Sequence, residues 1–238
     1  LDGWSVANLI RELVQDYLSR LEIGVPPIEI EAHSASMLAE YARLELEALE
    51  SSATQEFWRS SLAGSRATSL ESFVAHEAPA KAQPVATVLI PQWLQDAARQ
   101  LAASRGLPMK SLLLAAHCLT LQRASGEADV TTGLVTHGRP GRTGAEVAAG
   151  LFLNTIPVRL DDGHATWLDA IEHVAKIERA SHRHRRYPLQ AMQSDAGRPV
   201  FNVVFDYLNY HVFGAPAPDI GVELLGFDVH ERTNFALW

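Results

Sequence analysis

Apolar residues recur every three or four positions through the first part of the chain. This spacing places them on one face of a helix. It predicts a helix over residues 6–21, which Ser5 can cap, and two further helices over 35–50 and 54–62. The apolar face of the first helix is expected to be buried, and Gly24 with the prolines after it would end that helix.

The composition changes to Ala, Ser and Pro between residues 65 and 84. Prolines and small polar residues interrupt helical patterns, so this stretch predicts a boundary. We therefore expect two parts, residues 1–75 and residues 76–238.

Strands alternate with helices in the second part. The pattern predicts strands over 85–90, 129–137, 150–160, 199–210 and 222–229, one more starting at Asn234, and helices over 91–105, 109–123 and 166–184. Such alternation is typical of an α/β fold, which is the class that we expect.

The stretch from Gly150 to Leu160 is the most apolar of these strands, since no charged residue occurs between Glu146 and Arg159. It predicts a strand that is buried on both faces. Asn154 and Thr155 nevertheless lie in its middle. A buried polar group without a partner costs roughly 1–3 kcal/mol, so these two side chains either pair within the core or line a cavity, and we favour the cavity wall.

Composition excludes several classes of partner. With 20 Lys and Arg against 28 Asp and Glu, the formal net charge is −8, whereas a nucleic-acid partner requires clustered basic residues. No apolar run approaches the ~20 residues that span a bilayer, so no membrane partner is expected. The single cysteine, Cys118, excludes an intrachain disulfide and suits the reducing cytoplasm.

Neither a metal nor a nucleotide motif is evident. His117 and Cys118 are adjacent on the predicted helix, and neighbouring residues point about 100° apart, so the two cannot readily share a metal ion. The glycine-rich loop 137–144 lacks the dinucleotide fingerprint and the Lys-Ser/Thr of a phosphate loop. We expect no metal site, and a flexible turn in that loop.

Basic residues over 182–186 end the predicted helix 166–184. Cations at this end are favoured by the helix dipole, which makes a solvated helix terminus the simpler interpretation. Docking of an anionic carrier or cofactor is the alternative.

Five segments, in chain order, resemble the core motifs of condensation domains from nonribosomal peptide synthetases. Asp2-Gly3-Trp4-Ser5 resembles the end of the His-His-x-x-x-Asp-Gly motif with its Trp-Ser extension. Residues 150–159 match the Gly-x-Phe-Val-Asn-Thr-x-x-x-Arg motif, with Leu153 in place of Val. The looser similarities are Tyr41-Ala42 with Phe57-Trp58, the segment 184–190 with its Tyr-Pro pair, and the segment 198–209.

The resemblance implies a fold like that of chloramphenicol acetyltransferase, two lobes with a tunnel between them. The chain would supply most of the C-terminal lobe and the end of the N-terminal lobe. Donor and acceptor peptidyl carrier proteins would deliver substrates on phosphopantetheine arms, and an adenylation domain would be adjacent. No cofactor would be bound directly. The chemistry implied is amide formation, in which the acceptor amine attacks the donor thioester.

Both motif histidines, by the same resemblance, would precede Leu1. The chain is thus expected to be a fragment that needs the missing part of the N-terminal lobe. A proton-handling group must lie within hydrogen-bond reach of the amine, and none of the ten histidines of the chain stands at the motif position. We therefore expect no catalytic residue in this chain and no activity from it alone.

The resemblance also assigns roles to single residues. Asp2 is expected to be a structural carboxylate paired with an arginine, and Gly3 to permit close backbone approach. Our first candidate for the arginine is Arg139, because it lies at a strand end in the glycine-rich loop, and Arg159 is the second. We expect the tunnel wall to include four further residues: Ser5, Asn154, Thr155 and Asn209. A satisfied place in the core is the alternative for Asn209.

Other functions compatible with this architecture stay open. A related acyltransferase would make esters from alcohol acceptors, and a non-catalytic descendant would dock carrier proteins. Epimerisation is disfavoured because Trp4 precedes Ser5 here, the reverse of the order usual in epimerisation domains. A lipase-like hydrolase lacks its Gly-x-Ser-x-Gly elbow.

Overall fold

The computed structural model describes residues 1–21, 34–68, 70, 85–208, 235 and 237. Its elements, in order, are α1 (Gly3–Arg20), α2 (Ser34–Glu50), α3 (Ser52–Ser61), α4 (Gln92–Arg105), α5 (Met109–Ser125), β1 (Val130–His137), β2 (Leu153–Leu160), α6 (Trp167–Ser181), the 3₁₀ turn η1 (His182–His184), α7 (Leu189–Ala196) and β3 (Val204–Phe205). This mixture of helices and strands confirms the predicted α/β class. None of the described helices is long and apolar enough to cross a bilayer.

The chain divides into two compact units. One comprises Leu1–Glu47, His137–Asn154 and Leu208–Glu231, and the other comprises Ala48–Thr136, Thr155–Tyr207 and Arg232–Trp238. The boundary expected near residue 75 lies outside the described residues.

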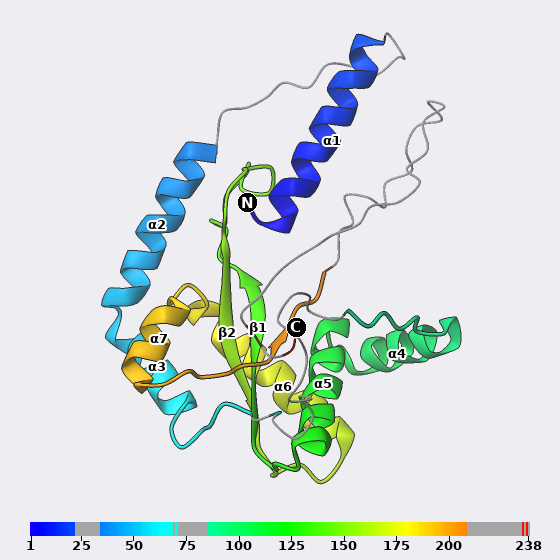
Figure 1. Cartoon of the computed structure of the whole chain (residues 1–238), viewed down its shortest axis with the longest axis vertical. Helices are drawn as coiled ribbons and strands as arrows, with labels where there is room; N and C mark the ends of the chain where they lie inside the picture. Colours follow the sequence, from blue (N-terminus) through cyan, green and yellow to red (C-terminus); the bar gives the residue numbers. More distant parts are fainter. Residues whose placement is uncertain (22–33, 69, 71–84, 209–234, 236, 238) are drawn as a thin grey trace, which may run out of the picture. The chain divides into compact units, whose positions relative to one another are not determined.

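The larger unit is built on a sheet with the strand order β2-β1-β3. β3 runs parallel to β1, with Gly133 opposite Val204, and Leu237 extends the pairing through a parallel bridge to Val203. α5 and α6 pack against each other beside this sheet (Figure 1). A Cβ atom at Gly133 would lie 2.4 Å from the ring of Phe201 and 2.7 Å from the methyl group of Thr155, so only glycine fits there.

The core of this unit draws on both the helices and the sheet. Leu114 and Cys118 of α5, Val158 of β2 and Val174 of α6 all have 0 % of their surface exposed. Burial of their apolar side chains is the main source of stability for α5 and α6. The ranges predicted for these helices, 109–123 and 166–184, differ from the observed ones by at most three residues at either end.

The smaller unit has a separate apolar cluster. Met37 of α2 packs with Ala145, Ala148 and Phe152, all from the segment that joins β1 to β2, and Tyr41 covers this cluster. The rings of Tyr41 and Phe152 meet edge to face with their centroids 5.5 Å apart. This cluster fixes the segment that carries the most apolar motif of the sequence.

Two predictions about strands were wrong. Residues 85–90 form no strand, and Val85, Val88 and Leu89 are more than four-fifths exposed. Apolar residues give a strand only where a partner strand supplies hydrogen bonds, and no described strand pairs with this segment. The strand expected over 199–210 is confined to Val204–Phe205 among the described residues.

The expected burial of α1 was also wrong. Leu13 and Tyr17 are 69 % and 60 % exposed, and the buried residues are Ser5, Ala7, Asn8 and Leu18. β2 is buried on both faces only in part, since Leu153 is exposed and Asn154, Thr155 and Arg159 are half-buried. Gly24 and the strand expected over 222–229 lie outside the described residues.

Candidate functional site

Asp2 caps α1 and is buried. Its carboxylate accepts a hydrogen bond from the backbone N–H of Ser5 at 2.8 Å, while its own N–H donates to the carbonyl of Gly150 at 2.9 Å. Carboxylates at helix N-termini are favoured by the unpaired N–H groups and the helix dipole. Asp2 is therefore the N-cap, and the prediction that Ser5 caps this helix was wrong because the helix begins at Gly3.

Arg139 forms a buried ion pair with Asp2. One terminal nitrogen of its guanidinium donates to both carboxylate oxygens, at 2.8 and 3.0 Å, and the other donates to the carbonyls of Ala145 and Ala148, each at 2.7 Å. The side chains of Asp2 and Arg139 are 1 % and 8 % exposed. Each charge is thus compensated where water is excluded, which a buried pair requires.

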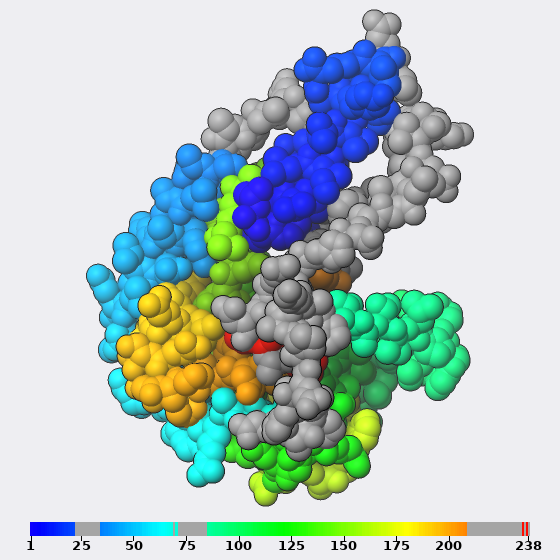
Figure 2. All heavy atoms as spheres, in the orientation of Figure 1, coloured from blue at the N-terminus to red at the C-terminus, as the bar shows by residue number. Residues whose placement is uncertain are grey.

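Ser5 and Gly150 connect this pair to the start of the Gly150–Leu160 motif. The Ser5 hydroxyl lies 2.7 Å from a carboxylate oxygen of Asp2 and 2.9 Å from the carbonyl of Gly150, and it accepts from the N–H of Gly150 at 3.0 Å. The second carboxylate oxygen of Asp2 accepts from the N–H of Phe152 at 3.2 Å. Figure 2 shows the start of α1, in dark blue, against the yellow-green segment that carries Arg139.

Phe152 closes the network from one side. Its ring has 0 % of its surface exposed, and the guanidinium carbon of Arg139 lies 4.3 Å from the ring centroid, a cation–π contact. A Cβ atom at Gly150 would lie 2.7 Å from both Phe152 and Leu38, so this glycine is required for the close approach. We name this arrangement of Asp2, Ser5, Arg139, Gly150 and Phe152 the Asp2 network.

One expectation about the Asp2 network can be compared with this geometry, and one member of the network was not expected. Of the two arginines considered as partners of Asp2, the structure places Arg139 there. Arg159 instead forms a bidentate pair with Asp129, at 2.8 and 2.7 Å, and donates to the carbonyl of Ala63. Sequence reasoning gave no separate role to Phe152, although its place in the uncharged stretch before Arg159 marked it for burial.

The residues expected at a tunnel wall have different surroundings. Ser5 has 0 % of its surface exposed, and its hydroxyl is enclosed within the Asp2 network. Asn154 is half-buried in the smaller unit, and Thr155 is half-buried in the larger one, where its methyl group packs near Gly133. Asn209 lies outside the described residues. Gly3 is the first residue of α1.

His117 and Cys118 have structural positions in α5. The Thr132 hydroxyl donates to the carbonyl of Val203 at 3.1 Å, so its hydrogen is used and Nε2–H of His117, 2.9 Å away, is the donor. Burial lowers the pKa of His117 from 6.5 to about 4. Burial also raises the pKa of the Cys118 thiol to about 12, which leaves it unreactive.

The chain matches the family model for the Condensation domain over residues 1–235. It therefore belongs to the Condensation domain family. Two solved structures have the same fold: a condensation domain of the Monacolin K polyketide synthase MokA (TM-score 0.67, 20 % identity, 87 % of this chain and 51 % of that one) and the first condensation domain of the calcium-dependent antibiotic synthetase (TM-score 0.69, 20 % identity, 88 % and 47 %).

Curated relatives in sequence are large synthetases. The AMB antimetabolite synthetase AmbE of Pseudomonas aeruginosa is 39 % identical over 211 residues, which are 89 % of this chain and 10 % of that protein. Malpibaldin synthetase of Mortierella alpina is 33 % identical over 155 residues, covering 62 % of this chain and 3 % of that protein. The chain thus spans about half of the solved domains and a tenth or less of these synthetases.

Proposed function

We propose that the chain is the part of a nonribosomal peptide synthetase condensation domain that follows the motif histidines, and that the complete domain joins two carrier-bound substrates through an amide bond. Membership of the Condensation domain family and the synthetases among its relatives support this proposal. The Asp2 network is the structural observation that carries it, because it joins the Asp-Gly-Trp-Ser segment to the Gly150–Leu160 motif.

The proposed reaction is an acyl transfer from the donor thioester to the amine of the acceptor aminoacyl group. The free amine of the acceptor aminoacyl group attacks the donor thioester carbonyl, a C–N bond forms and the C–S bond breaks. The sulfur leaves on the phosphopantetheine arm of the donor carrier, and the proton that the amine loses ends on this sulfur, which becomes a free thiol. Because orientation of the reacting groups supplies much of the rate enhancement in such transfers, residues that fix the peptide next to the proton-handling histidine affect turnover.

The Asp2 network has this positioning role in the proposal. Its hydrogen bonds fix the backbone at Asp2 through the carbonyl of Gly150 and through the first turn of α1. We propose that this holds the motif residues ahead of Asp2 in their working orientation. Asp2 and Arg139 have no part in proton transfer, since each is fully engaged with the other and with backbone groups.

The proposal extends to partners and to the isolated chain. Donor and acceptor peptidyl carrier proteins, a neighbouring adenylation domain and the remainder of the N-terminal lobe are its expected partners, and the cytoplasm is its expected location. Asn154, Thr155 and Asn209 stay our candidates for residues that face the substrates. The 238-residue chain alone is proposed to be inactive, because none of its histidines stands in the motif position.

The test compares the 238-residue chain with a polypeptide extended upstream to include the whole N-terminal lobe and its motif histidines. Both are incubated with an acyl-loaded donor carrier and an aminoacyl-loaded acceptor carrier, and products are identified by mass spectrometry. We expect the extended polypeptide to form the amide and the shorter chain to form none. The matched control is the extended polypeptide with the second motif histidine replaced by alanine.

Each contrary outcome has its own meaning. Products from hydroxyl acceptors but not from amines would replace the amide-forming proposal with the ester-forming one. Carrier binding without any product from the extended polypeptide would favour the docking module. Amide formation by the 238-residue chain alone would overturn the proposal that catalysis depends on the upstream histidines.

A further inference from the structure

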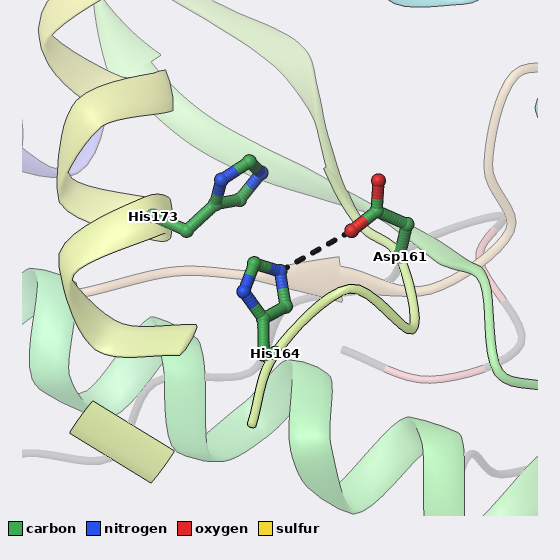
Figure 3. A group of neighbouring side chains, drawn as sticks. All are labelled: Asp161, His164 and His173. Carbon is green, nitrogen blue, oxygen red and sulfur yellow. Dashed lines mark ion pairs between the residues drawn. The ribbon is translucent and has the colours of Figure 1, made fainter. Parts of the chain in front are cut away.

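Three side chains of types that can bind a metal ion lie close together where β2 connects to α6. Asp161 follows the last residue of β2, His164 lies in the connecting segment, and His173 lies on α6. Figure 3 shows the ring of His173 projecting from the helix toward the other two side chains. All three residues belong to the larger unit, and sequence reasoning assigned none of them a role.

The distances among these side chains are close to those of a coordination sphere. Nε2 of His164 lies 3.3 Å from a carboxylate oxygen of Asp161, and the two imidazole rings have their centroids 4.5 Å apart. One ligand atom from each residue can be chosen so that all three lie within 4.8 Å of one another. Ligands bound at about 2.0–2.1 Å around a tetrahedral ion are about 3.3 Å apart, so small side-chain rotations complete the geometry.

One ligand atom of the cluster lacks a hydrogen-bond partner among the described residues. Nε2 of His164 is buried and has no hydrogen-bond partner among the described residues, although a carboxylate oxygen is near it. Such an orphaned polar atom is uncommon in folded proteins.

The backbone around the cluster is held in place. Thr166 caps α6 and forms a reciprocal capping box with Asp169, which fixes the start of the helix two turns before His173. Asp161 and His173 line a pocket of about 310 Å³, and Asp161 and His164 line a second pocket of about 470 Å³. Both pockets are open to the surface, so an ion can reach the three side chains.

We propose that Asp161, His164 and His173 form a binding site for a divalent transition-metal ion, with Zn²⁺ as the ion that suits it best. Two imidazoles and one carboxylate are ligands that zinc accepts, whereas magnesium and calcium prefer oxygen ligands throughout. The ion would link Asp161 and His164, in the connection between β2 and α6, to His173 on α6. Because it binds the folded chain, it also stabilises that state.

The test is zinc binding by the whole chain after removal of metal with EDTA, measured by isothermal titration calorimetry at pH 7.5. We expect one equivalent of Zn²⁺ to bind and saturating zinc to raise the melting temperature. Asp161→Asn should weaken binding at least about tenfold, and His164→Ala more, since even residues that only orient a ligand contribute roughly 10–100-fold.

Two matched variants control for loss of charge and loss of a histidine. Asp162→Asn removes the neighbouring exposed carboxylate, and His182→Ala removes an exposed imidazole away from the cluster. Both should bind zinc like the wild type. Because the Asp161 side chain is 54 % exposed, Asp161→Asn keeps its fold even if His164→Ala does not, and circular dichroism verifies this.

Cobalt provides an independent readout of the ligands. Co²⁺ bound in place of zinc should give visible absorption bands typical of a tetrahedral site, and His173→Gln should abolish them. The proposal is overturned if no equivalent of zinc binds, or if Asp161→Asn and His164→Ala bind zinc as the wild type does. It is equally overturned if Mg²⁺ raises the melting temperature as much as Zn²⁺.

Discussion

At the scale of single residues, Asp2 carries the largest expected stability effect. Replacing it with asparagine leaves the guanidinium of Arg139 buried at 8 % exposure without its counter-charge. Removing one member of a buried pair costs about 3–5 kcal/mol, so Asp2→Asn should lower the free energy of unfolding by about that amount. Urea unfolding monitored by circular dichroism measures the change.

The matched control for this substitution is Asp16→Asn. Asp16 pairs with Arg20 on the exposed surface of α1, at 2.8 Å, with both side chains more than half exposed. Such pairs contribute little because water screens them. A loss of stability in Asp16→Asn equal to that in Asp2→Asn would show that the Asp2 network adds nothing beyond a surface ion pair.

The residues of the Asp2 network were predictable from sequence to different degrees. Resemblance to a family motif indicated a structural role for Asp2, and the glycine-rich loop after a strand pointed to Arg139. The double use of Ser5 and the ring of Phe152 over Arg139 depend on a fold that brings residues 2–5 next to residues 139–152. The contacts of Asp2 and Ser5 join residues more than 130 positions apart, and the contact of Phe152 with Arg139 depends on how the connecting segment folds, so local sequence specifies neither.

At the scale of elements, the capping box of α6 makes a defined contribution. The hydroxyl of Thr166 accepts from the N–H of Asp169 at 3.1 Å, and the carboxylate of Asp169 accepts from the N–H of Thr166 at 3.0 Å. Loss of an N-cap side chain typically costs about 1 kcal/mol. Thr166→Ala should therefore lower the free energy of unfolding by about 1 kcal/mol, measured by urea denaturation.

Thr120→Ala is the control for the cap. Thr120 lies inside α5, is exposed, and its hydroxyl donates to the carbonyl of Ala116 one turn earlier. Alanine has the higher helix propensity, so this change should leave stability the same or slightly higher. An equal loss in both threonine variants would contradict the role of the Thr166 hydroxyl as a cap.

Elements with strong end signals were predicted closely and those without them were not. α4 ends at Arg105 before Gly106, whose φ of 60° is left-handed, and both ends of α4 agree with the sequence within a residue or two. The predicted strand over 85–90 had an apolar composition but pairs with no described strand, and the length of β3 depends on which backbone lies beside it. Strand pairing is a property of the whole fold, so a single sequence specifies it weakly.

At the scale of the whole molecule, the buried imidazole of His117 links stability to pH. Its pKa falls from 6.5 to about 4 on folding, so the unfolded chain binds this proton more readily than the folded chain. Above pH 6.5 the ring is neutral in both states and does not lower the free energy of unfolding. As the pH falls from 6.5 toward 4, the unfolded chain takes up the proton and the free energy of unfolding decreases. Urea midpoints measured from pH 7 to pH 5 should decline accordingly.

His117→Gln tests the origin of this decline. Glutamine keeps an N–H donor for the Thr132 hydroxyl but does not titrate. The variant should show a shallower dependence on pH than the wild type over the same range. If the two slopes agree, another group is responsible for the acid sensitivity and the assignment to His117 is wrong.

The buried thiol of Cys118 has a practical consequence for spectroscopy. It is the one cysteine of the sequence, has 0 % of its surface exposed, and does not ionise at neutral pH. Maleimide dyes react with thiolates, so the native chain offers them no target. A cysteine introduced at the exposed position of Leu13 would become a unique attachment point, and fluorophores could be installed without first deleting the natural sulfhydryl.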